Sequence, residues 1–283
     1  MPTIRTNGIE TYYERRGDGR PIVFIHGAIM DHRMWATQVD ALDDEFTTVA
    51  YDVRGHGRTG GSAVPAYSVA LYVEDLDALL TALGFERPAL CGLSLGGCIA
   101  QAYAETYPEK VSSLVLADTF TQAPLGLAGQ LLFTNLRVFA ALDRVIRYKS
   151  LNRFQMRLGN FVKPGVAGEG GTVQELIDAG ATISHAEFVK IVNSLVAFPR
   201  GGNVELSRID APTLILYGEN EPSLMRNHAV LMGELIPNTK SVTEIPDAGH
   251  ASNIDNPVFF TEAVRKFLGG LGDESTFNES EKS

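Results

Sequence analysis

Short β-branched and apolar runs alternate with longer helical patterns along most of this 283-residue sequence. Such alternation is typical of βαβ units, in which helices join parallel strands and cover the sheet. Several runs are apolar throughout, which indicates strands that are buried on both faces. The sequence therefore predicts an α/β fold with a mostly parallel sheet flanked by helices.

Eight strands are expected, and the first two are separated by Asn7-Gly8, a dipeptide that favours a tight hairpin. The predicted strands are Thr3–Thr6, Thr11–Glu14, Pro21–Ile25, Thr47–Tyr51, Ala89–Cys91, Leu114–Ala117, Thr213–Tyr217 and Ser241–Ile245. The helices predicted around them are Ser68–Leu83, Leu95–Tyr107, Ser223–Leu235 and Pro257–Leu268.

The interval 119–208 separates the sixth strand from the seventh and is too long for a loop. Its sequence indicates several helices broken by Gly and Pro, with ten basic residues against six acidic ones. We interpret it as a helical cap whose basic side chains form a solvated face. The remaining core is assigned to 1–118 and 209–270, and the polar, acidic tail 271–283 is expected to be disordered.

Composition narrows the class of protein. A net charge of −10 makes nucleic acid an unfavourable partner. No apolar run reaches the roughly 18–20 residues that span a bilayer, so no membrane partner is expected. The N-terminus shows no secretory pattern, which favours a cytoplasmic location. The oligomeric state is left open, a homodimer included. Cys91 and Cys98 are interpreted as small buried apolar residues.

The segment Cys91-Gly92-Leu93-Ser94-Leu95-Gly96-Gly97 lies between a predicted strand and a predicted helix. In that context G-x-S-x-G indicates a nucleophile elbow, a sharp turn that pushes a serine hydroxyl clear of the backbone. Glycine avoids the steric clash of a Cβ atom in so tight a turn. Ser94 is therefore the candidate nucleophile.

A serine hydroxyl needs a base to remove its proton. Among six histidines, His250 directly follows the last predicted strand, from which a loop can reach back over the edge of the sheet. His26 and His56 occur in turns after earlier strands and are expected to position loops. His250 is the candidate base.

An acid is expected to orient His250 and to stabilise its imidazolium form. Glu221 follows the seventh strand in Tyr217-Gly218-Glu219-Asn220-Glu221-Pro222 and is our choice. The rival carboxylates that stay open are Glu219, Asp118 and Asp247. The backbone N–H groups of Ala28 and Leu95 are the expected oxyanion hole.

Together these residues resemble the α/β-hydrolase superfamily over about residues 3–268. The order Ser94…Glu221…His250 matches the nucleophile–acid–histidine order of that fold. His26-Gly27 and Asp52-x-Arg54-Gly55-x-Gly57 match its companion motifs. The resemblance is to capped esterases, lactonases and enol-lactonases. One departure is glutamate where many relatives carry aspartate, and a nucleophilic serine argues against the haloalkane dehalogenase and epoxide hydrolase branches.

The resemblance implies a serine hydrolase that cleaves a small-molecule carboxylic ester or lactone through an acyl-enzyme. The substrate is expected beneath the cap, against Ile29, Met30, Phe120 and Leu125. No metal or organic cofactor is expected, because no group of His, Cys and acids has ligand spacing. The alternatives are a cofactor-free haloperoxidase or lyase with the same triad, or a ligand-binding receptor with slow turnover.

Overall fold

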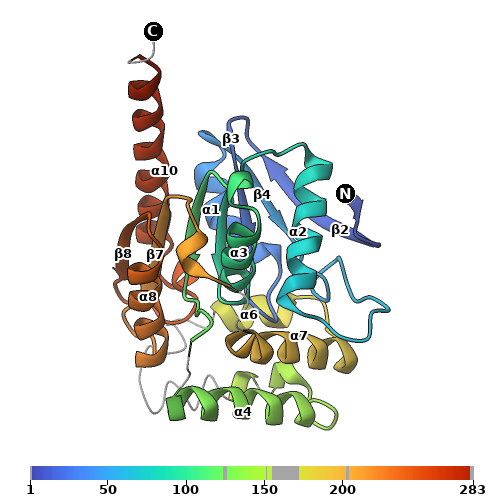
Figure 1. Cartoon of the computed structure of the whole chain (residues 1–283). Coiled ribbons are helices and arrows are strands. Elements are labelled where there is room, and N and C mark those ends of the chain that lie inside the picture. Colours follow the sequence, from blue (N-terminus) through green and yellow to red (C-terminus); the bar gives the residue numbers. More distant parts are fainter. Residues whose placement is uncertain (1, 124–125, 151, 155–171, 202–203, 281–283) are drawn as a thin grey trace.

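The computed structural model describes residues 2–123, 126–150, 152–154, 172–201 and 204–280. Within these ranges the strands form one sheet in the order β1-β2-β4-β3-β5-β6-β7-β8 (Figure 1). Their bounds are β1 Thr3–Thr6, β2 Ile9–Arg16, β3 Arg20–Ile25, β4 Phe46–Tyr51, β5 Ala89–Leu93, β6 Ser113–Ala117, β7 Thr213–Gly218 and β8 Thr239–Ile245. Pairing is parallel from β4 to β8, and β2 is antiparallel to both β1 and β4. The predicted α/β fold is confirmed.

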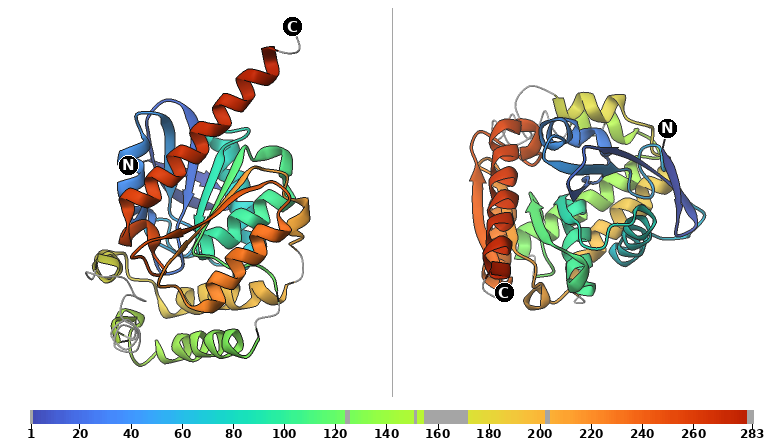
Figure 2. Two further views of the ribbon diagram at one scale, coloured as in Figure 1. Left: turned by 90° about the vertical axis from the view of Figure 1, so that its left-hand side faces the viewer. Right: turned by 90° about the horizontal axis from the view of Figure 1, so that it is seen from above.

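Helices cover both faces of this sheet (Figure 2). On one face lie α2, α3 and α8, and on the other lie α1 and α10. Their bounds are α1 Ala36–Leu42, α2 Val69–Leu83, α3 Leu95–Thr106, α8 Ser223–Leu235 and α10 Pro257–Ser280; the short α9 is Ser252–Asp255. This layering follows from strands that are apolar on both faces, since each face must be buried against helices.

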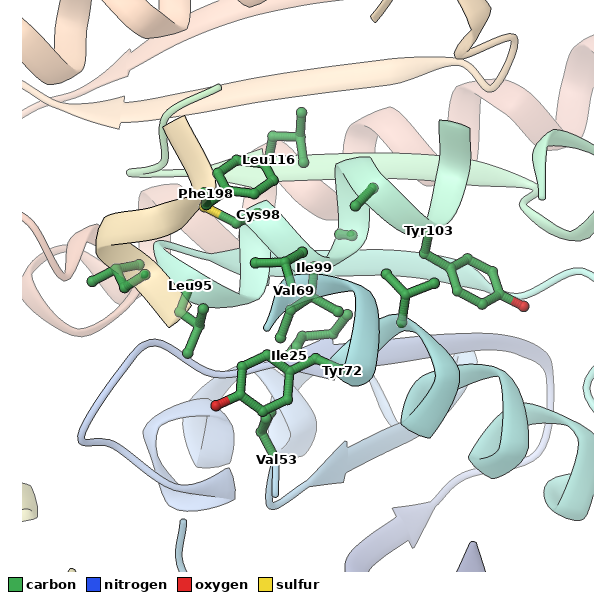
Figure 3. Close-up of a cluster of buried hydrophobic side chains, with 14 of the residues drawn as sticks. Ile25, Val53, Val69, Tyr72, Leu95, Cys98, Ile99, Tyr103, Leu116 and Phe198 are labelled. Carbon is green, nitrogen blue, oxygen red and sulfur yellow. The ribbon is translucent and has the colours of Figure 1, made fainter. Parts of the chain in front are cut away.

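Alternate side chains of each central strand enter different hydrophobic clusters. In β3, Val23 and Ile25 face α2 and α3, whereas Ile22 and Phe24 face α1 and α10. Figure 3 shows side chains of the first cluster, which includes Ile25 and Leu116 of the sheet and Val69, Tyr72 and Ile99 of α2 and α3. Because helices pack tightly against both faces of the sheet, the carboxyl ends of the central strands have fixed positions.

Helices also occupy the interval between β6 and β7, below the sheet in Figure 1. They include α4 (Gly126–Leu142), α6 (Thr172–Ala179) and α7 (His185–Ala197). Phe139 of α4 packs against Phe188 of α7, with ring centroids 6.0 Å apart. Helix α7 is tied to the loop after β4, because Lys190 donates to the carbonyl of Ser62 at 2.9 Å. The cap boundaries 119–208 stay a prediction.

The described part of the C-terminal segment belongs to α10, which ends at Ser280. The disorder expected from residue 271 stays a prediction. The tail contains no proline, and extending an existing helix costs less than starting one. Residues 281–283 lie outside the described ranges. In the described part of the chain, no helix is long and apolar enough to cross a membrane.

A buried ion pair fixes the loop after β4 to α2, and it provides a stability prediction. The guanidinium of Arg54 donates to Asp75 at 2.7 Å, and both side chains are at most 7% exposed. Arg54→Ala leaves the buried Asp75 carboxylate without this partner, so we expect a loss of about 3–5 kcal/mol in unfolding free energy. Arg153→Ala, which removes an exposed pair with Asp178, is expected to cost about 1 kcal/mol or less. Urea unfolding of both variants checks this, and equal losses would contradict it.

Candidate active site

Ser94 lies between β5 and α3 in a strained turn. Its φ is 54° and its ψ is −114°, a backbone conformation that is rare for a residue with a side chain. The glycines beside it are required by space. A Cβ at Gly92 would lie 2.3 Å from the Gly96 carbonyl oxygen, and one at Gly96 would lie 2.0 Å from the Ile25 carbonyl oxygen. The predicted elbow geometry is therefore built into the local sequence.

The structure brings Ser94, His250 and Glu221 into one hydrogen-bonded line. The Ser94 Oγ atom is 3.1 Å from His250 Nε2, and His250 Nδ1 is 2.7 Å from Glu221 Oε1. Each residue follows the carboxyl end of a strand: Ser94 follows β5, Glu221 follows β7, and His250 follows β8. Glu221 is 1% exposed and Ser94 8%, whereas the His250 side chain retains 48% of its surface. Chain segments more than 100 residues apart thus meet at one edge of the sheet.

The electrostatics of this line favour a charged imidazole. Desolvation of the half-exposed ring lowers the pKa of His250, but the charge and hydrogen bond of Glu221 outweigh it and raise that pKa to about 9. Asp118 and Asp255 add smaller effects in the same direction. The site is therefore arranged to stabilise the imidazolium that forms when the histidine accepts a proton.

The four candidate acids have different partners. Glu221 bonds His250, whereas Glu219 accepts a hydrogen bond from the backbone N–H of Asp247 at 2.9 Å. Asp247 itself occupies a turn with φ 57°. Asp118 accepts from backbone N–H groups of two other loops. Of these carboxylates, Glu221 is in the place that an orienting acid requires.

The expected oxyanion donors flank the serine. Leu95 begins α3 directly after Ser94, and Ala28 follows β3. A Cβ at Gly27 would lie 3.5 Å from the Cβ of Ser94, which places this loop beside the nucleophile. The next residue, Ile29, has φ 61°, a strained conformation for a β-branched residue. Both N–H groups thus belong to segments with tightly constrained backbones, and their role stays a prediction.

The other motif histidines hold loops in place. His26 Nε2 accepts from the Val53 N–H at 2.9 Å, and its Nδ1 is 2.8 Å from the carbonyl oxygen of Gly27. Burial lowers the pKa of His26, so the neutral ring is favoured. His56 Nδ1 lies 3.1 Å from the Arg54 carbonyl oxygen. These contacts match the loop-positioning role expected for both residues.

Asp31, His32 and Asp52 form a buried group whose candidate ligand atoms lie within 4.8 Å of one another. The Asp31 carboxylate is engaged by Arg33, and His32 Nδ1 lies 2.7 Å from Asp52 Oδ1. Asp52 also accepts from the His32 N–H at 2.8 Å. The candidate ligand atoms are thus already paired with neighbouring side chains and backbone groups. This arrangement fits a structural network better than a metal site. Sequence reasoning missed His32, because its partner lies 20 residues away.

The expected substrate-binding residues have varied surroundings. Ile29 and Met30 are partly buried against the core. Phe120 is 5% exposed and packs edge-to-face on Phe133 and Phe198, at centroid distances of 5.3 and 6.1 Å. Leu125 lies outside the described residues. Phe120 therefore belongs to an aromatic cluster between the core and the helices below it, and substrate contact stays a prediction for all four.

A sequence model described as the alpha/beta hydrolase fold matches residues 20–257. The chain belongs to the α/β-hydrolase family. This α/β hydrolase is 24% identical over 258 residues to 3-oxoadipate enol-lactonase 2 of Acinetobacter baylyi, an alignment that covers 89% of this chain and 90% of that relative. Among solved structures it is similar to a thermophilic esterase from Thermogutta terrifontis, with 27% identity, a TM-score of 0.76, and coverage of 95% and 97%. A bromoperoxidase from Bacillus anthracis, at 23% identity, TM-score 0.75, and coverage of 92% and 96%, shares the fold.

Proposed function

We propose that this α/β hydrolase cleaves a carboxylic ester or lactone through a serine-bound acyl-enzyme. The observation that carries the proposal is the continuous line from Glu221 through His250 to Ser94, with distances of 2.7 and 3.1 Å. Similarity to an enol-lactonase and to an esterase supports the same substrate class. An aromatic cluster surrounds Phe120, which directly follows Thr119, the residue whose hydroxyl donates to the Ser94 carbonyl. This cluster supports a largely apolar acyl group.

The proposed reaction has two halves. First, Ser94 Oγ attacks the carbonyl carbon while His250 Nε2 takes its proton, and the N–H groups of Leu95 and Ala28 bind the oxyanion. The imidazolium then gives this proton to the leaving alkoxide as the C–O bond breaks. Second, a water molecule gives a proton to His250 and attacks the acyl-enzyme. Collapse releases the acid and returns the proton to Ser94.

Ester and lactone assays test the proposal. We expect the wild type to release p-nitrophenol from p-nitrophenyl acetate and butyrate, and to open a lactone, with saturation kinetics. Bromide-dependent oxidation or cyanohydrin cleavage that exceeds ester turnover would contradict the proposal and favour the alternative chemistry. Tight ligand binding with negligible product release would contradict it in favour of a receptor.

The pH dependence follows from the raised pKa of His250. The base must be neutral to accept the serine proton, and in the free enzyme it titrates well above its ordinary 6.5, near pH 9. We therefore expect kcat/KM to rise with pH between about 7 and 9. A pH profile with p-nitrophenyl butyrate, corrected for spontaneous hydrolysis, checks this expectation. A plateau already reached at pH 7 would contradict it.

A further inference from the structure

The two residues that follow β6, Asp118 and Thr119, form hydrogen bonds with the segments that carry the proposed catalytic residues. Asp118 is 1% exposed and Thr119 3%. The Asp118 backbone has φ 44°, a left-handed conformation that an ordinary strand end does not need. Strain of this kind persists where the surroundings fix a residue firmly.

The Asp118 carboxylate connects two loops that carry different members of the proposed triad. Its Oδ1 accepts the backbone N–H of Gly218, at the start of the turn that carries Glu221, at 3.0 Å. Its Oδ2 accepts the backbone N–H of Ser252 at 3.0 Å and the Ser252 hydroxyl at 2.6 Å. Ser252 lies two residues after His250. One side chain therefore fixes the acid turn and the histidine loop relative to each other.

The two loops also meet closely at this point. A Cβ at Gly218 would lie 2.3 Å from the Gly249 carbonyl oxygen and 2.5 Å from that of Ala248. The backbone N–H of Asn220 donates to the Ala248 carbonyl at 2.8 Å. With so little free space, a small shift of either backbone changes the distance between Glu221 and His250.

Thr119 extends the same arrangement to the nucleophile. Its hydroxyl donates to the Ser94 carbonyl at 2.7 Å, and the Ser94 N–H donates to the Ala117 carbonyl at 3.0 Å. The strained elbow is thus anchored to the end of β6 from both sides. All three proposed catalytic residues depend on contacts with residues 117–119.

We propose that Asp118 is a positioning residue of the hydrolase, whose ionised carboxylate fixes the Glu221 turn against the His250 loop. The inference rests on the proposed function. Its chemistry explains why aspartate is needed. Two carboxylate oxygens accept three donors, whereas an asparagine in the same place would turn its NH₂ group toward one of the donating N–H groups.

The charge of Asp118 has a separate effect. Burial and the nearby Glu221 charge raise the pKa of Asp118, whereas the hydrogen bonds from Ser252 lower it and stabilise the ionised form. The carboxylate in turn raises the pKa of His250. The groups facing His250 are Glu221 from the turn after β7, Asp118 from the end of β6, and Asp255 from α9. Near pH 9, where His250 titrates, Asp118 is ionised. Removing its charge lowers the pKa of His250.

A fluorophosphonate probe tests the inference, because it labels an activated serine whatever the natural substrate is. The variants are Asp118→Asn, Ser252→Ala, which removes one donor and retains the carboxylate, and Asp143→Asn as a control. Asp143 is likewise a buried carboxylate that accepts a backbone N–H, that of Tyr148, at 2.6 Å. It directly follows α4, and its other oxygen lies 3.0 Å from Nδ1 of His185 at the start of α7. The readouts are the second-order labelling rate constant, its pH profile and the melting temperature.

For Asp118→Asn we expect labelling to slow about 10- to 100-fold, since a misplacement of about 1 Å costs on the order of 10² in rate. In its pH profile, the range over which labelling becomes faster with rising pH (the acid limb) should also move to lower pH. Ser252→Ala should slow labelling less and leave the limb in place, and Asp143→Asn should match the wild type. A folded Asp118→Asn with wild-type rate, or with an unshifted limb, overturns the inference. If that variant does not fold, an unchanged rate for Ser252→Ala overturns it, and a slowed rate supports it.

The same experiment separates this inference from the function on which it rests. A wild type that the probe does not label contradicts the serine mechanism, and the positioning role falls with it. A labelled wild type together with a wild-type-like Asp118→Asn contradicts only the positioning role.

Discussion

Ser94→Ala is expected to lower ester turnover by about 10⁴- to 10⁶-fold. The variant removes the Oγ atom that lies 3.1 Å from His250 Nε2, so no acyl-enzyme can form there. Oxyanion donors and substrate binding survive, which leaves a small rate above that of water. Turnover of p-nitrophenyl butyrate, with wild type and variant purified in parallel, measures the effect.

A matched control separates lost chemistry from lost structure. Ser194→Ala also removes a buried serine hydroxyl, which donates to the Ile191 carbonyl at 2.7 Å on α7. This control should retain turnover within about 3-fold, because a lost neutral hydrogen bond costs only about 1 kcal/mol of stability. Near-wild-type activity in Ser94→Ala would show that another group performs the attack.

Glu221→Gln is expected to lower kcat by about 10³- to 10⁴-fold. The amide retains the size of the carboxylate, but its NH₂ group cannot accept a hydrogen bond from Nδ1–H, and the charge that stabilises the imidazolium is lost. The acid limb of kcat/KM should also move to lower pH, since Glu221 is the main cause of the raised pKa of His250. Steady-state kinetics from pH 6 to 10 measure both effects.

Glu219→Gln is the matched control for this experiment. Glu219 lies two residues away in the same turn and accepts from the Asp247 N–H at 2.9 Å. We expect its substitution to change kcat by about 3-fold or less, as for an exposed hydrogen bond away from the reacting atoms. If Glu219→Gln is the more damaging change, the assignment of the acid is wrong.

Most of the fold was predictable because buried parallel strands leave a clear apolar pattern. The strand that precedes Ser94 and the helix that follows it were predicted to within two residues. The segment 32–42 was missed, although it forms a 3₁₀ turn and α1. Trp35 fixes it by packing on Phe24 and Phe260, at centroid distances of 5.1 and 5.9 Å, and such contacts are invisible in a local pattern.

The candidate site was predictable where local geometry decides. Ser94 lies in a motif whose glycines indicate a tight turn, and His250 directly follows the end of a predicted strand. The sequence favoured Glu221 but left Glu219 open, because the path of one turn determines which carboxylate points toward the imidazole. The bonds of Asp118 with Gly218 and Ser252 join residues 100 and 134 positions apart, so no local pattern indicates them.

Trapping the acyl-enzyme tests the central claim most directly. Wild-type protein mixed with p-nitrophenyl butyrate is quenched in acid within the first turnovers, digested, and mapped by mass spectrometry. We predict a butyryl adduct on the peptide that contains Ser94, formed at the same rate as the initial burst of p-nitrophenol and absent from Ser94→Ala. An enzyme that turns over the ester while its adduct lies on another residue would contradict the mechanism.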